Sequence, residues 1–150
     1  MSGSVDAGEV EALQTALAGE HAAVWVYGVL GGQTSRSATP ALFREVESGY
    51  VAHRGRRDLL VRSLRDLDAE PVAAEVAYAL PNPVATPRQV GLAALVTEQR
   101  CAATYADTVA RTTARRRTFA IESLTESAVR QLGLRGSPET FPGADELADR

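Results

Sequence analysis

The chain of 150 residues contains no lysine, a single cysteine and few aromatic residues, which make up 5% of the sequence. Because Cys101 is alone, no disulfide can form within the chain. The sequence also lacks the roughly 18 consecutive apolar residues of a membrane span, and it does not begin with a basic segment followed by an apolar run. We therefore expect a cytoplasmic protein without membrane contact.

An excess of positive charge is absent as well, because the net charge is −3 even though all sixteen basic residues are arginine. Proteins that bind nucleic acids usually present a basic face, so we do not expect a nucleic-acid partner. The one basic patch consists of Arg111, Arg115, Arg116 and Arg117. A solvated turn followed by a helix start explains this patch most simply, and contact with phosphate or RNA is the alternative.

What the sequence does contain is abundant alanine and four stretches in which apolar residues recur every three or four positions. This spacing places the apolar side chains on one face of a helix, and small apolar residues suit close helix packing. We expect helices over about residues 9–30, 40–67, 87–111 and 115–134. Thr39-Pro40 and Thr86-Pro87 each combine a favoured N-cap residue with proline at the first helical position.

The lengths of the connections predict the topology. Short links join the first helix to the second and the third to the fourth, whereas about eighteen residues, 68–85, separate the second from the third. Short links make antiparallel neighbours, so we expect an all-α, antiparallel four-helix bundle of the ferritin-like type with a long crossover between helices 2 and 3. We expect one domain over residues 9–134, a flexible N-terminus (1–8) and a mobile acidic tail (135–150).

Polar residues interrupt three of the apolar helix faces at mid-length. Glu20 interrupts the first helix, Glu98 the third, and Tyr50, His53 and Arg57 the second. If these faces meet, the five side chains share one buried polar layer.

The first and third helices resemble each other around their glutamates. A tyrosine follows each glutamate after seven residues, at Tyr27 and Tyr105. Two hairpins related by approximate twofold symmetry would bring these helices together, with Glu20 facing Glu98. We expect the tyrosines to pack at the edge of the layer.

A carboxylate-bridged metal pair requires more ligands than these faces supply. It takes a glutamate from each of two helices and a Glu-x-x-His pair from each of the other two. The residue three before His53 is Tyr50, and the fourth helix has no histidine. The face that we expect the fourth helix to turn inward carries no ligand either: Thr118, Ile121, Thr125, Ala128 and Leu132. We expect no metal; if iron or manganese is bound, Glu20, His53 and Glu98 would hold it.

Arg57 can supply the cation that two buried carboxylates require. Arginine stays protonated in proteins, and its guanidinium can bond both carboxylates at once. We therefore interpret Glu20, Tyr50, His53, Arg57 and Glu98 as a buried cluster that satisfies its own charges. A mononuclear metal site and a small-ligand pocket are the alternatives. Cys101 lies three residues after Glu98, so it can flank the layer as an inert buried thiol.

Three motifs and one longer run suggest a family. The motifs are Glu20-His21-Ala22-Ala23, His53-x-x-x-Arg57-Asp58 and Tyr78-Ala79-Leu80-Pro81, and the run covers residues 98–106. Together they resemble an uncharacterised ferritin-like domain family, over roughly residues 10–132. The resemblance implies a ferritin-like four-helix bundle that commonly associates as a dimer, and it implies no established activity.

The expected function follows from these interpretations. We expect a metal-free, ferritin-like homodimer with a structural or interaction role rather than an enzyme. The alternative is an iron- or manganese-binding oxidoreductase with a reduced ligand set. Iron-storage proteins and di-iron oxidases belong to the broader superfamily, but a shared fold does not transfer their activity.

Overall fold

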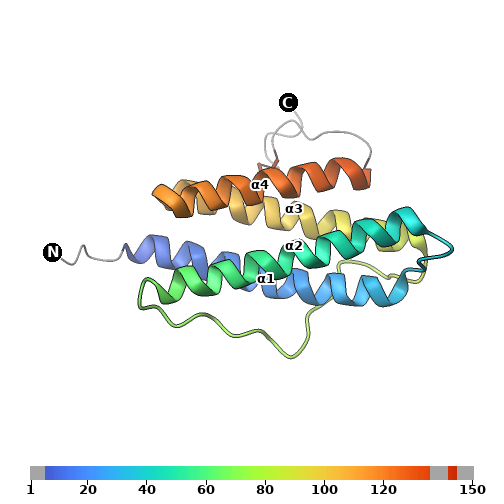
Figure 1. Cartoon of the computed structure of the whole chain (residues 1–150), viewed down its shortest axis with the longest axis horizontal. Helices are drawn as coiled ribbons and strands as arrows, with labels where there is room; N and C mark the ends of the chain where they lie inside the picture. Colours follow the sequence, from blue (N-terminus) through green and yellow to red (C-terminus); the bar gives the residue numbers. More distant parts are fainter. Residues whose placement is uncertain (1–5, 136–141, 145–150) are drawn as a thin grey trace.

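The computed structural model describes residues 6–135 and 142–144, and within them it contains four α-helices and no strand (Figure 1). The helices are α1 (Ala7–Gln33), α2 (Pro40–Arg65), α3 (Pro87–Arg111) and α4 (Ala114–Arg135). The predicted all-α class is thereby confirmed for these residues. Most of the predicted flexible N-terminus and acidic tail lies outside the described residues.

The helix ends show which sequence signals acted. The side chain of Asp6 caps α1 by accepting a hydrogen bond from the backbone N–H of Gly8. Thr86 and Gln89 form a capping box at the start of α3, as its sequence favours. The predicted end of α1 at Leu30 was wrong, because the helix continues to Gln33. Glycine weakens a helix by only about 1 kcal/mol per residue, so tertiary packing can carry the helix past it.

The four helices lie side by side along their lengths (Figure 1). α1 packs extensively on α2, α3 on α4, and α1 on α3, whereas α2 makes few contacts with α3 and α4. The long connection after α2 runs along the outer side of α1 (Figure 1). The side chain of Gln14 fixes it there through hydrogen bonds to the backbone of Glu70 and Val72, and Trp25 packs on Tyr78. α1 and α3 therefore form the central pair, with α2 packed on α1 and α4 packed on α3.

The hydrophobic core divides into two clusters along the bundle. One contains Leu13, Leu17, Leu60, Leu64 and Tyr105, and the other contains Val26, Leu30, Val46, Val90 and Ala94, among further residues. On α2 and α3, the polar residues His53 and Glu98 fall between the positions that these two clusters occupy. The polar layer thus interrupts the core at mid-length.

The predicted inner face of α4 was wrong. The residues that α4 buries are Ala120, Ser123, Ser127 and Gln131. Ile121 and Leu132, which we expected inside, are 47% and 42% exposed, and Val129 is 63% exposed. The inner face is polar because it meets charged groups: Ser127 accepts a hydrogen bond from Arg56. α4 therefore leaves Ile121, Val129 and Leu132 on the solvent side, whereas its Phe119, Leu124 and Leu134 are partly buried against the core.

Gly49 provides a test of the packing between α1 and α2. A Cβ atom at this position would lie 2.3 Å from Cε1 of the Tyr27 ring. We expect Gly49→Ala to lower the free energy of unfolding by about 2–3 kcal/mol, because the ring must shift and its hydrogen bond must weaken. Urea unfolding measures this. Gly55→Ala, in the same helix with nothing near its Cβ, should instead raise stability by about 0.5–1 kcal/mol; equal effects of the two substitutions would contradict the packing.

Candidate functional site

Three helices contribute one ionisable side chain each to a layer that is closed to solvent. Glu20 comes from α1, His53 from α2 and Glu98 from α3, and none is more than 1% exposed. Nδ1 of His53 lies 2.6 Å from a carboxylate oxygen of Glu20, and Nε2 lies 3.0 Å from one of Glu98. The structure therefore brings together three of the five side chains expected in the cluster.

This geometry favours a protonated His53. A neutral imidazole has one nitrogen that can only accept, whereas both nitrogens here face carboxylate oxygens, which also only accept. Burial lowers the pKa of His53, but the charges and hydrogen bonds of Glu20 and Glu98 outweigh it and raise the pKa from 6.5 to about 9. For Glu98 the two effects have the opposite sign. Burial raises its pKa, but the hydrogen bond and the charge of His53 lower it by more, so the pKa of Glu98 is below its usual value. An imidazolium thus bridges two carboxylates.

Two buried tyrosines complete the layer by crossing between α1 and α3. Tyr27 on α1 donates a 2.6 Å hydrogen bond to Glu98 on α3, and Tyr105 on α3 donates one of the same length to Glu20 on α1. Burial and the adjacent glutamate raise the pKa of each tyrosine well above its usual value. Both phenols therefore stay protonated as donors. The repeated Glu-x₆-Tyr spacing marked this pair, but we expected the rings only to pack at the edge of the layer; instead their hydroxyls bond its glutamates.

The guanidinium expected from Arg57 comes from Arg56 instead. Arg56 is 4% exposed and lies 3.8 Å from Glu20, with further hydrogen bonds to Glu126 and Ser127. Burial lowers the pKa of Arg56, but Glu20 and Glu126 raise it above its usual value, so the charge is retained. Arg57 points toward solvent and pairs with Asp58 at 2.8 Å. The predicted place of Arg57 in the cluster was wrong by one residue.

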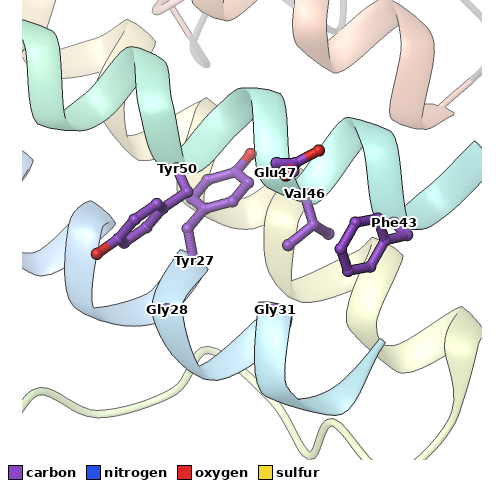
Figure 2. Close-up of a pocket in the computed structure, with 7 residues that line it drawn as sticks. All are labelled: Tyr27, Gly28, Gly31, Phe43, Val46, Glu47 and Tyr50. Carbon is purple, nitrogen blue, oxygen red and sulfur yellow. The ribbon is translucent and has the colours of Figure 1, made fainter. Parts of the chain in front are cut away.

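Tyr50 is also outside the layer. Its ring lies in a surface groove between α1 and α2, beside Gly28 (Figure 2).

α4 supplies two groups that sequence reasoning missed. Nε of Arg130 lies 3.2 Å from Glu98, and the side-chain amide of Gln131 donates a hydrogen bond to the backbone carbonyl of Glu98. Neither residue belongs to the apolar face that we predicted to turn inward, so no sequence signal marked them.

The charges of the layer balance within the chain. The two carboxylates, Glu20 and Glu98, meet the cations of His53, Arg56 and Arg130, and Arg56 is also paired with the exposed carboxylate of Glu126. Three positive charges thus face three negative ones. Burying an ion such as Glu20 or Glu98 alone would be costly, whereas here each buried charge has an opposite charge beside it, although one carboxylate oxygen of Glu98 has no hydrogen-bond donor.

The raised pKa of His53 predicts how stability depends on pH. A histidine whose folded-state pKa of about 9 exceeds its unfolded value of 6.5 stabilises the fold fully below pH 6.5. This contribution, about 3 kcal/mol, is lost progressively as the pH rises through 9. Urea unfolding at several pH values from 6 to 10 should show the decline. A stability that stays level over this range would rule out the bridging imidazolium.

The donor set of the layer does not favour a bound metal ion. Ligand atoms of Glu20, His53 and Cys101 lie within 4.8 Å of one another, close enough for one ion. However, a metal-bound histidine must be neutral, and both nitrogens of His53 already contact carboxylates. Burial raises the pKa of the Cys101 thiol well above its usual value, which opposes the thiolate form that metals bind. The guanidinium of Arg56 beside Glu20 adds a competing positive charge.

The basic patch near the α3–α4 turn is partly neutralised. Arg111 pairs with Glu11 and Asp107, and a guanidinium nitrogen of Arg116 lies 2.9 Å from a carboxylate oxygen of Glu9. These two arginines thus connect α1 to the turn.

Among the described residues, no helix has both the length and the apolar character needed to cross a membrane.

Comparison with known proteins gives a family without an assigned role. No curated protein matches the chain significantly. Among solved structures, the chain is similar to the crystal structure of a conserved hypothetical protein, rv2844, from Mycobacterium tuberculosis. The two share 29% sequence identity and a TM-score of 0.79, over 86% of this chain and 89% of that one. Residues 12–146 match the family described as domain of unknown function DUF4439. Because the match covers most of the sequence, the chain belongs to this family.

Proposed function

We propose that the four helices form one antiparallel, ferritin-like bundle over residues 9–134. The contacts of α1 with α3 and with the turn after it support opposite directions. From the start to the end of α1, Glu9, Glu20 and Tyr27 bond Thr113, Tyr105 and Glu98, which run backwards along the chain. The long connection between α2 and α3 supports the ferritin-like order of the helices. A cytoplasmic location stays a prediction from the sequence.

Within this bundle, we propose a structural or interaction role that needs no metal. The observation that carries this proposal is the His53 imidazolium between Glu20 and Glu98. In metal-binding bundles of this type, cations are bound between carboxylates at this level. Here the chain's own cations meet those carboxylates, so the layer serves to hold α1, α2 and α3 in register.

Elemental analysis tests the metal-free layer. The protein would be purified from cells grown with added iron and manganese, and a second sample would be loaded with ferrous iron without oxygen. We expect far less than one metal ion per chain in both samples. Stoichiometric metal that disappears in Glu20→Gln would overturn the proposal, and Glu47→Gln, which changes an exposed glutamate, is the control.

The second candidate is an iron- or manganese-binding oxidoreductase with a reduced ligand set. Two observations favour it: the second carboxylate oxygen of Glu98 is buried without a hydrogen-bond donor, and Cys101 adds a possible ligand near Glu20 and His53. Binding would require His53 to lose its proton. Uptake of one metal ion per chain that strengthens as the pH rises and disappears in His53→Leu would support this candidate, and no uptake at any pH at which ferrous and manganous ions stay dissolved would exclude it.

We propose that the interaction partner is a second copy of the chain and that α4 forms the interface. Ile121, Thr125, Ala128 and Leu132 follow a 4-3-4 spacing along α4, and Ile121, Thr125 and Leu132 are exposed. This spacing reads the same in both directions, so two antiparallel α4 helices related by a twofold axis would match their apolar residues. Sedimentation equilibrium should show a dimer that Ile121→Glu converts to a monomer; a monomeric parent protein would refute the proposal.

A further inference from the structure

The surface groove between α1 and α2 has the size of a small-ligand site. Its volume is about 350 Å³, and seven residues line it: Tyr27, Gly28, Gly31, Phe43, Val46, Glu47 and Tyr50. Figure 2 shows Tyr50 and Phe43 at the two ends of the groove, with Val46 between them. Ligand pockets begin at about 300 Å³ and are mostly apolar with a few polar groups. This groove, with one carboxylate, fits that description.

The two glycines on the α1 side have no packing reason within the described residues. A Cβ at Gly31 would meet nothing within 4 Å, and one at Gly28 would make only an ordinary contact with Tyr50 at 3.8 Å. Each glycine inside a helix costs about 1 kcal/mol relative to alanine. The fold would therefore be more stable with side chains here, and those side chains would fill the groove.

The walls of the groove already attract cations. The guanidinium of Arg36 lies over the ring of Phe43 at 4.8 Å and reaches a carboxylate oxygen of Glu47 at 3.9 Å. Both side chains of this ion pair are largely exposed, so the pair is weak and can exchange. A guanidinium also lies over the ring of Tyr50, that of Arg54 at 5.5 Å. Ring faces and a carboxylate together select positive charge.

We propose that this groove binds a small organic cation with a ring-sized apolar body, such as an arylalkylammonium. The apolar body would rest on Val46 and on the bare backbone at Gly28 and Gly31. The ammonium would lie at Glu47 in place of the Arg36 guanidinium. This inference does not depend on the proposed function, because Tyr27 is the one residue that the groove shares with the buried layer.

Calorimetric titration tests the proposal with three probes of similar shape: 2-phenylethylammonium, neutral 2-phenylethanol and anionic 3-phenylpropanoate. We expect the cation to bind most tightly and the anion least. Glu47→Gln should remove the difference between the cation and the alcohol. In the unsubstituted protein, the changes in amide chemical shift that the cation causes should be largest at Val46, Glu47 and Tyr50. Equal binding of all three probes, or shifts centred elsewhere, would overturn the proposal.

A matched pair of glycine variants separates filling of the groove from general effects. Gly31→Leu should weaken binding of 2-phenylethylammonium at least tenfold, because the new side chain occupies the groove. Gly32→Leu is the control, since Gly32 also has open space around its Cβ but does not line the groove. Circular dichroism checks that both variants fold. Unchanged binding in Gly31→Leu, or equal losses in both variants, would refute the site.

Discussion

Replacing His53 with leucine is expected to lower the free energy of unfolding by about 3–5 kcal/mol at neutral pH. Leucine has a similar size, so the loss does not arise from a cavity. It arises because Glu20 and Glu98 would face each other across the layer without the imidazolium between them. Urea unfolding followed by circular dichroism measures the change. The variant should also lose the fall in stability between pH 6.5 and 9.

Two further variants show whether the charge of His53 causes this effect. His21 is the only other histidine and makes one hydrogen bond, to the backbone carbonyl of Val72 at the surface. His21→Leu should therefore cost less than about 1 kcal/mol. Adding Glu98→Gln to His53→Leu should restore part of the stability, because one buried charge is removed. A double variant that is less stable than His53→Leu alone would contradict this account.

The extent of the helices could be predicted because their signals are local. The three-to-four spacing of apolar residues placed all four helices, and the Thr-Pro pairs marked the start of two of them, with no helix end wrong by more than three residues. Glu20, His53 and Glu98 could be recognised because a charged residue in an otherwise apolar face stands out. The internal repeat predicted that Glu20 faces Glu98 and marked the two tyrosines, whereas the position of His53 between the glutamates comes from the structure.

The choice between neighbouring positions on α2 could not be predicted. Stepping through Tyr50 and Arg57, or through Gly49 and Arg56, gives the same spacing of three and four residues around His53. Adjacent residues differ by 100° around a helix, so the choice decides which arginine is buried. The ring of Tyr27 decides it, because only a residue without a Cβ allows the ring to approach α2 so closely. That contact lies between helices and leaves no trace in either helix alone.

The prediction of which face of α4 is turned inward was wrong for a related reason. The rule that apolar residues face inward assumes an apolar interior. At mid-length this interior is ionic, so α4 turns Ser123, Ser127 and Gln131 inward. Ile121, Val129 and Leu132 are then left outside, where they can serve association. The exposed stripe on α4 is thus a consequence of the ionic layer that this helix faces.

Replacing Arg56 with alanine is expected to lower the free energy of unfolding by about 3 kcal/mol, the lower end of the range for a broken buried ion pair. The value is at the lower end because Glu20 keeps His53 and Tyr105 as donors. Arg57→Ala is the matched control: its guanidinium pairs with Asp58 at the surface, and such pairs contribute about 1 kcal/mol at most.

Arg56→Met separates charge from packing, because methionine keeps an unbranched stem beside the Tyr105 ring while removing the guanidinium. If charge dominates, Arg56→Met should lose nearly as much stability as Arg56→Ala in the same urea titration. Comparing the losses of stability at the two positions then distinguishes the two arginines that the sequence leaves equivalent. A large loss of stability in Arg57→Ala with a small loss in Arg56→Ala would mean that α2 is rotated by one residue relative to this structure. Large and similar losses in Arg56→Ala and Arg56→Met, with little change at Arg57, would instead show that the charge of Arg56 lies among the buried carboxylates.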